Sequence, residues 1–550
     1  MKAGVQATAI RGISLATLVM ILAVSLAGPP PAAAGVPRAP RASVAQGVLV
    51  GRWARVDGVR LSEFRGIPYA APPVGRLRWR PPQPASHWSG ARDARRFGPR
   101  CMQLPLFGDM VFRSEGMSED CLYLNVWASV VSPVPGAARP RPVLVYFFGG
   151  GFVGGDGSER RYDGASLAAR GIVMVTVNYR LGVFGFFALP ALAAESPRHA
   201  AGNYGLLDQV AALEWVRANI AAFGGDPTRI TIGGESAGAI SVSALMASPL
   251  SKRWITGAIG ESGALIAPLG PKPLAAAERQ GAAFAAAVGA RSLAALRALP
   301  ASDLLRMSGP DAMPKLEFYP DVDGYFLTED PAATFARGAQ AHVPLLVGSN
   351  SEEQSSRTVL GGEAPTAAHY AAALVRLFGP LAGRAAALYP GGDRTAVLRS
   401  ATALAGDLFI AHSTWAWMDL QRRTGRAPVY YYYFDRARPA KRNPAKGERP
   451  DTGAVHSGEI EYALGNLATN RVYAWTPTDY RVSRAMEGYF ARFVATGDPN
   501  GAGRPHWPAV RAAGGGLLRE TIGGDTHATI DREAARQTFL TRFFADHPSP

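Results

Sequence analysis

A serine flanked by glycines, Gly234-Glu235-Ser236-Ala237-Gly238, lies between an apolar β-branched run and a helical stretch. The run covers residues 230–232, and the stretch covers residues 239–246. A strand that turns directly into a helix strains the backbone at the serine, and it requires glycines where neighbouring chain passes too close for a β-carbon. The pattern therefore favours an α/β fold in which the Ser236 hydroxyl projects from a sheet at a helix N-terminus. Taken alone, the pattern also fits an ordinary glycine-rich turn.

Other apolar runs alternate with helical patterns along the chain. Runs that are apolar on both faces are typical of central strands in a parallel sheet covered by helices. They lie at residues 143–148, 172–177, 255–259 and 343–347. The clearest helix covers residues 206–222, and the alanine-rich residues 274–305 indicate a helical insertion. We therefore expect an α/β fold with a large, mostly parallel central sheet, flanking helices and helical insertions.

A glycine triplet offers a second element of a reactive site. A serine nucleophile needs a base, and the negative oxygen that forms in its reaction needs hydrogen-bond donors. Gly149-Gly150-Gly151 follows the run at residues 143–148, and consecutive glycines allow backbone N–H groups to turn toward a ligand. We predict an oxyanion hole made by the N–H groups of Gly150, Gly151 and Ala237. A phosphate-binding loop is disfavoured, because the lysine of a P-loop is absent.

Eight stretches spread over most of the chain carry a family resemblance. They are residues 64–70, 72–79, 118–126, 178–180, 202–209, 223–227, 453–456 and 496–500. Together they resemble the type-B carboxylesterase/cholinesterase family, and within it the bacterial para-nitrobenzyl esterases. The resemblance implies the α/β-hydrolase fold and hydrolysis of small-molecule carboxylic esters through an acyl-enzyme, with no metal or cofactor.

The resemblance also implies the partners of Ser236. The family orders its triad Ser, Glu, His along the chain, and His456, at the end of Gly453-Ala454-Val455-His456, matches the histidine. The acid falls in an acidic pair after a buried run. Its second member, Glu353, matches the catalytic residue, and Glu352 is its solvated or structural neighbour. Gln354 replaces the family glycine that follows the acid.

Residues beside the triad are assigned from the same resemblance. Ser262 is similar to a hydrogen-bonding residue that supports the triad from behind. His412 and His506 lie outside any family motif, and we interpret them as packing or surface residues. Two ion pairs resemble structural pairs of the family, Arg78 with Glu119 and Arg180 with Asp208.

Departures from the family pattern limit the substrate. Phe148 stands before the glycine triplet, where the family usually has histidine or tyrosine. The segment between Cys101 and Cys121 contains Phe107 and Phe112 but no tryptophan. Cholinesterases use a tryptophan there to hold a quaternary ammonium by cation–π attraction, so choline esters are disfavoured and a general carboxylesterase is favoured. The alternatives are a non-catalytic, neuroligin-like binding protein and a hydrolase of lipid, polymer or carbamate esters.

The two cysteines, Cys101 and Cys121, are the only ones in the chain. In an exported protein, one pair close in sequence indicates a disulfide that closes a small surface loop. A cysteine nucleophile or metal ligand is disfavoured, because no metal-ligand spacing accompanies the pair.

The N-terminus has the pattern of a secretory signal. Lys2 and Arg11 precede a short apolar stretch at residues 13–26, prolines follow, and Ala32-Ala33-Ala34 offers a cleavage site. We predict a signal peptide at residues 1–34, a Pro/Ala-rich linker at 35–45 and one hydrolase domain at 46–546. The apolar stretch is too short to span a bilayer comfortably. The expected product is therefore a secreted or periplasmic protein without a stable membrane anchor.

The formal net charge of +15 comes mainly from scattered arginines. Only residues 436–449 are locally basic, and their prolines and lack of aromatic residues indicate a solvated loop rather than a nucleic-acid platform. We therefore expect no nucleic-acid partner, although a basic surface attracts acidic substrates. The oligomeric state cannot be inferred from the composition.

Overall fold

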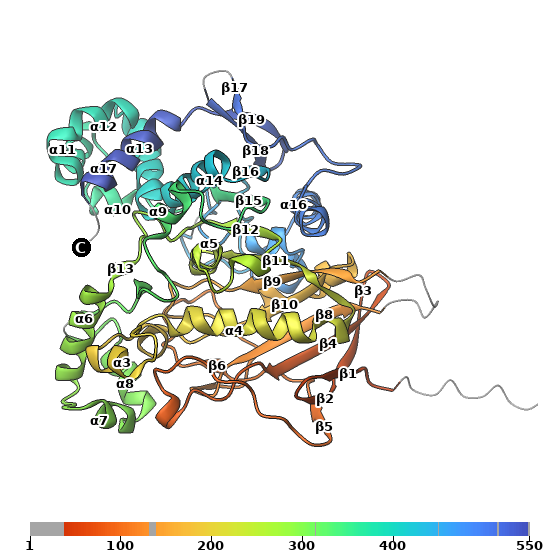
Figure 1. The fold of residues 1–550 in the computed structure, drawn as a ribbon. Helices are drawn as coiled ribbons and strands as arrows, with labels where there is room; N and C mark the ends of the chain where they lie inside the picture. The colour runs from red at the N-terminus through yellow and green to blue at the C-terminus, as the bar shows by residue number, and fades with distance from the viewer. Residues whose placement is uncertain (1–37, 131–138, 314, 449, 514–515, 548–550) are drawn as a thin grey trace, which may run out of the picture. The chain divides into compact units, whose positions relative to one another are not determined.

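A twelve-stranded sheet runs through the part of the chain that the computed structural model describes, residues 38–547 without 131–138, 314, 449 and 514–515 (Figure 1). Its centre is parallel and runs in the order β10 (Val173–Val177), β9 (Arg141–Phe147), β11 (Gly225–Glu235), β12 (Gly257–Glu261), β15 (Leu345–Asn350), β16 (Val429–Phe434) and β18 (Gly516–Ile522). Antiparallel strands extend both margins: β8 (Tyr123–Ser129), β4 (Val59–Pro68) and β3 (Arg52–Val56) on one, β17 (Ala512–Ala513) and β19 (His527–Asp531) on the other. The predicted central sheet is thus confirmed, with a parallel centre and antiparallel margins.

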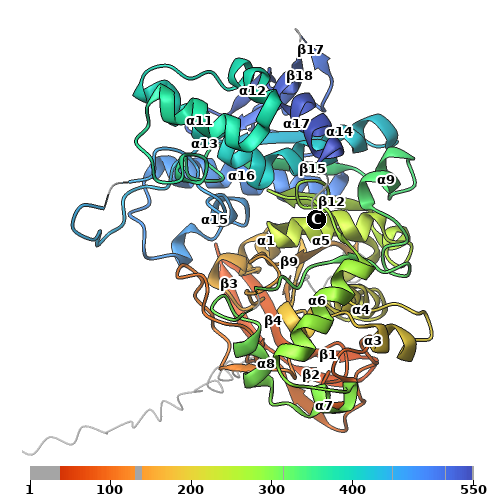
Figure 2. The ribbon, with the colours of Figure 1, turned by 90° about the vertical axis from the view of Figure 1, so that its left-hand side faces the viewer.

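The central strands are buried on both faces because helices cover them. Every residue of β10 and β15 is buried, as the apolar runs indicate. Helices α4 (Tyr204–Asn219) and α5 (Ala237–Ala247) lie on one side of the sheet and α16 (Pro477–Thr496) lies on the other (Figure 2). The alanine-rich insertion consists of three helices, α6 (Leu274–Ala287), α7 (Leu293–Ala298) and α8 (Ala301–Met307).

A second, smaller apolar core lies apart from the sheet. It is built by α10 (Arg357–Leu360), α11 (Ala367–Phe378), α12 (Ala382–Leu388), α13 (Arg394–Gly406) and α17 (Ala534–Asp546) (Figure 1). The segment Ala367–Leu388 is long and apolar enough to cross a membrane. It breaks at Gly379, whose φ is +52°, and its Phe378 packs on Phe539 and Phe543 of α17. Within this fold the segment forms two helices, α11 and α12, that pack on the smaller core.

The N-terminal regions are described only in part. The predicted signal peptide, residues 1–34, lies outside the described residues. Part of the predicted linker is a strand: β1 (Arg41–Val44) pairs with β2 (Gly47–Val50), and both belong to the compact unit of residues 39–550. Residues 41–44 form a strand despite the Pro/Ala-rich surroundings because Ala42 and Val44 alternate inward and are buried.

Candidate active site

Ser236 stands at the turn between β11 and α5. Its φ of 54° and ψ of −122° lie in a region that residues with a β-carbon rarely adopt. The backbone N–H of Ser236 donates to Glu261 O (2.8 Å) on the neighbouring strand β12 and holds the turn in place. The flanking glycine is required, because a β-carbon on Gly238 would lie 2.0 Å from Phe147 O. The strand, turn and helix therefore present the Ser236 hydroxyl as the motif predicts.

Three predicted residues meet through their side chains. His456 Nε2 lies 3.1 Å from Ser236 Oγ, and His456 Nδ1 lies 2.7 Å from Glu353 Oε2. Glu353 is buried, and its Oε1 accepts from Ser262 Oγ (2.6 Å) and from the N–H of Asn350 (2.6 Å). Ser262 and His456 therefore contact opposite oxygens of the same Glu353 carboxylate.

The residues considered as alternatives to Glu353 and His456 lie outside this set of contacts. Glu352 accepts from Thr452 Oγ1 (2.8 Å). His412 is buried on Gln537, with 2.7 Å between its Nδ1 and Gln537 Oε1, and His506 is exposed. The hydrogen bond of the Ser236 hydroxyl runs to His456 rather than to any of these three.

A further carboxylate, Glu235, is not singled out by the sequence patterns. It is 1% exposed, and its Oε1 lies 3.3 Å from His456 Nε2, the nitrogen that also faces Ser236. Ser457 donates to the same oxygen. Burial raises the pKa of Glu235, against the opposing effects of His456 and Ser457. The only sequence signal is the position of Glu235 inside the Gly-x-Ser-x-Gly pattern.

The charge on His456 responds to both carboxylates. Burial disfavours the imidazolium, but Glu235 and Glu353 outweigh it and raise the pKa of His456 to about 9. Farther from the serine, burial raises the pKa of Glu459 to about 8, helped by repulsion from Glu235 and Glu353. His456 thus gains a proton more readily than a free imidazole, while the buried Glu235 and Glu459 hold their own protons more tightly than free carboxyls.

The glycine loop after β9 lies directly beside the serine. A β-carbon on Gly149 would lie 3.0 Å from Ser236 Cβ, and Gly150 and Gly151 have φ values of +109° and +60°. Among the described residues, none of the hydrogen bonds of loops, turns and side chains uses the N–H of Gly150, Gly151 or Ala237 as its donor. These three N–H groups therefore have no protein acceptor among those hydrogen bonds.

The disulfide between Cys101 and Cys121 is present, with a Cα–Cα distance of 5.0 Å. It closes a loop that reaches the glycine loop, since a β-carbon on Gly150 would lie 3.0 Å from Met110 Cε and one on Gly154 would lie 3.3 Å from the Phe107 ring. Leu106, Phe107 and Val111 of this loop are exposed. Apolar side chains thus border the approach to the glycines.

The two implied ion pairs are also present and lie away from Ser236. Arg78 makes two contacts of 2.6 Å with Glu119, and Arg180 makes two contacts of 2.7 Å with Asp208. Within the described residues, no group of three or more histidine, cysteine or acidic side chains is arranged to hold a metal ion.

This sheet, with a serine elbow after a central strand and a histidine and carboxylate from later loops, defines the α/β-hydrolase class. The model of the carboxylesterase family matches residues 38–372 and 386–536, and the chain belongs to this family. It is a carboxylic ester hydrolase.

Several characterised relatives are similar over most of their length. The fumonisin B1 esterase of Sphingopyxis macrogoltabida is 36% identical over 84% of both chains. The para-nitrobenzyl esterase of Bacillus subtilis is 35% identical over 88% of this chain and 96% of its own. The human cocaine esterase is 34% identical over 84% of both chains.

Proposed function

We propose that the protein is an exported serine carboxylesterase that works through an acyl-enzyme on Ser236, with His456 as base and Glu353 as the orienting acid. The observation that carries this proposal is the continuous set of contacts from Ser236 Oγ across His456 to Glu353 Oε2 at a strained serine elbow. In such a set the middle imidazole accepts the serine proton while the carboxylate stabilises the imidazolium.

The reaction then follows in two halves. Ser236 Oγ attacks the ester carbonyl as its proton passes to His456 Nε2, and the N–H groups of Gly150, Gly151 and Ala237 bind the oxyanion. The tetrahedral intermediate collapses, and His456 returns the proton to the departing alcohol. Water attacks the acyl-Ser236 ester by the same route, releasing the carboxylic acid and restoring the serine.

We propose uncharged or apolar esters as substrates. Phe107 and Met110 border the glycine loop, so the group that lies beside the carbonyl contacts hydrocarbon rather than charge. The related proteins are named for fumonisin B1, para-nitrobenzyl esters and cocaine, which supports a general carboxylesterase. The alternatives remain a neuroligin-like binding role and hydrolysis of lipid, polymer or carbamate esters.

We further propose that residues 1–34 direct export and are removed after Ala34, and that the hydrolase domain covers residues 46–546, preceded by the strand at residues 41–44. The disulfide between Cys101 and Cys121 supports an oxidising compartment.

A labelling experiment tests the nucleophile and the catalytic role together. A fluorophosphonate probe should modify Ser236, identified by mass spectrometry of the peptide, and Ser236→Ala should lose more than 99% of its activity on short-chain nitrophenyl esters while keeping its thermal midpoint. The control is Ser355→Ala, an exposed serine beside the acid, which should be labelled and active like the wild type. Full turnover by Ser236→Ala would overturn the mechanism.

A further inference from the structure

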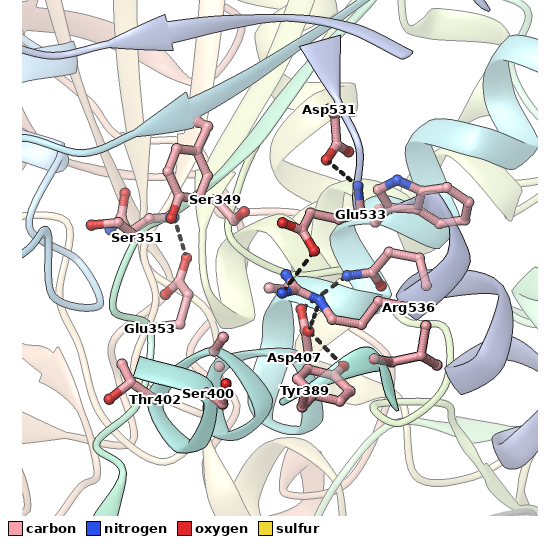
Figure 3. A pocket seen from close by; sticks show the side chains of 18 of the residues that line it. Ser349, Ser351, Glu353, Tyr389, Ser400, Thr402, Asp407, Asp531, Glu533 and Arg536 are labelled. Atoms are coloured by element: carbon pink, nitrogen blue, oxygen red, sulfur yellow. Dashed lines mark hydrogen bonds and ion pairs between the residues drawn. The ribbon is translucent and has the colours of Figure 1, made fainter. Parts of the chain in front are cut away.

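A polar cavity of about 380 Å³ lies beside the elements that carry Glu353 (Figure 3). Its lining includes Glu353 and the end of β15 but neither Ser236 nor His456. The remaining lining comes from the end of α12 and the turn after it, from α13, η6 (Asp407–Ala411), α14 (His412–Thr424), β16, β18 and β19, and from the start of α17. A volume of this size falls in the range of small-molecule sites, about 300–1,000 Å³. The cavity is therefore a candidate binding site that is separate from the ester site.

Most of the charged side chains that line the cavity are paired with one another. Arg536 lies 2.8 Å from Asp407 and 2.8 Å from Glu533, as Figure 3 shows, and Arg519 lies 3.3 Å from Asp531. The exposed Arg399 adds one cation to the lining. A strongly charged ligand would have to break these pairs, because a buried ion requires a partner.

The rest of the lining includes neutral hydroxyl groups and aromatic rings, one of which has a buried N–H without a partner. Trp415 is 7% exposed, and its indole Nε1 is buried without a hydrogen-bond partner. The lining also carries the hydroxyls of Ser349, Thr402, Tyr431 and Tyr433, together with those of Ser351 and Ser400, which each keep a second hydrogen-bonding position beside their contacts with Ala454 and Pro390. A buried N–H without a partner calls for an acceptor, and a lining of hydroxyls with aromatic rings suits a neutral ligand that carries several hydroxyl groups.

The cavity adjoins two residues that contact the His456 ring, Glu353 and Phe409. Asn350, whose N–H holds Glu353 Oε1, lies in the lining. On the other side, Asp407 and Ala411 of η6 line the cavity, while Phe409 of the same turn packs edge-on against His456 with 5.1 Å between ring centroids. η6 is a π-helical turn between two α-helices, and such turns often occur at functional sites.

We propose that this cavity binds a small, neutral, polyhydroxylated molecule such as a cyclitol or monosaccharide, and that its occupancy changes the rate of ester hydrolysis through η6 and the Glu353 strand end. The change in rate rests on the proposed roles of Glu353 and His456, whereas the binding itself does not.

Protection of an introduced thiol tests the binding. Both native cysteines form the disulfide, so Thr402→Cys places a free thiol in the cavity, and Thr395→Cys places a matched, exposed thiol on the same helix, outside the lining. myo-Inositol or glucose should slow modification of the Thr402→Cys variant by benzyl methanethiosulfonate at least fivefold, measured by mass spectrometry, and should leave the rate for Thr395→Cys unaffected. Equal rates for Thr402→Cys with and without these compounds, or protection by sodium sulfate alone, would overturn the proposal.

The same modified proteins test the effect on hydrolysis. A benzyl group on the thiol of Thr402→Cys should lower kcat at least threefold with little change in KM, whereas the same modification of Thr395→Cys should leave kcat within 1.5-fold. Unchanged kcat after full modification of Thr402→Cys would refute the link to the ester site. Adding Ser236→Ala to Thr402→Cys should keep the protection by myo-inositol, which separates this site from the proposed nucleophile. Ala403→Cys, also in the lining, serves if Thr402→Cys fails to fold.

Discussion

His456 is shared by two carboxylates that approach different ring nitrogens. Glu353 accepts at Nδ1, and Glu235 lies near Nε2 beside the serine. A carboxylate at Nδ1 fixes the tautomer in which Nε2 can accept a proton. A carboxylate at Nε2 instead stabilises the imidazolium after the proton has moved, so the two groups have separable effects on rate and on pH dependence.

Replacing single glutamates by glutamine tests whether Glu353 or Glu352 is the acid of the triad. Glu353→Gln should lower kcat/KM by about 10³-fold or more, because an amide favours the wrong imidazole tautomer. Glu352→Gln should stay within threefold of wild type, since its side chain contacts Thr452 rather than His456. Kinetics on a nitrophenyl ester measure both, and a larger loss in Glu352→Gln would exchange the two roles.

The pH profile should report the raised pKa of His456. Only the neutral imidazole accepts the Ser236 proton, so kcat/KM should rise with pH through the His456 pKa of about 9, above the ordinary value of 6.5. Glu235→Gln removes one carboxylate that stabilises the imidazolium and should move this limb to lower pH. The exposed Glu363→Gln is the control. An unshifted limb in Glu235→Gln would show that Glu235 does not act on His456.

Ser236 can be proposed from the sequence because it lies in a Gly-x-Ser-x-Gly pattern between a strand and a helix, whereas His456 is assigned only through the family resemblance of residues 453–456. Glu235 lies in the same motif as Ser236, but nothing in its identity shows that its side chain turns toward an imidazole 221 positions later in the chain. Such a contact depends on how the later loop returns to the sheet, which local patterns do not specify.

Some strands and helices can likewise be predicted from the local sequence, and others cannot. The run at residues 143–148 predicts β9 because an apolar, β-branched segment identifies a buried strand. β16, with the sequence Val-Tyr-Tyr-Tyr-Tyr-Phe, is not among the predicted strands, although it is central and mostly buried. The π-helical turn η6 has no local signal, because its residues also suit an ordinary helix; the packing of neighbouring side chains decides its form.

The serine elbow should be intolerant of one methyl group. Gly238→Ala places a β-carbon 2.0 Å from Phe147 O, so we expect a loss of at least about 1–3 kcal/mol and of ester hydrolysis. Gly383→Ala, in α12 with nothing within 4 Å of its β-carbon, is the matched control and should be neutral or gain about 0.5–1 kcal/mol. Thermal denaturation measures both changes. Equal midpoints for Gly238→Ala and wild type would contradict the close approach.

At the scale of the whole molecule, the cross-link between Cys101 and Cys121 fixes the loop that borders the glycines. Replacing both cysteines by serine should cost about 3 kcal/mol, because a closed loop of 20 residues restricts the unfolded chain. The thermal midpoint should fall, and the wild type with a reducing agent should match the variant. If neither the double substitution nor the reducing agent changes the thermal midpoint, the loop is held by its other contacts, such as the ion pair between Arg78 and Glu119.

The position of helix α17 near the end of the chain affects the order in which the two cores can form. Gln537 of α17 bonds to Asp407, 130 positions earlier, and Phe539 and Phe543 cover Phe378 of α11. Since synthesis proceeds from the N-terminus, α10 to α13 emerge long before their last partner and must wait with an open apolar face. A chain halted just before α17 would therefore have most of its sheet strands made but this smaller core still uncovered, a form suited to capture by a chaperone.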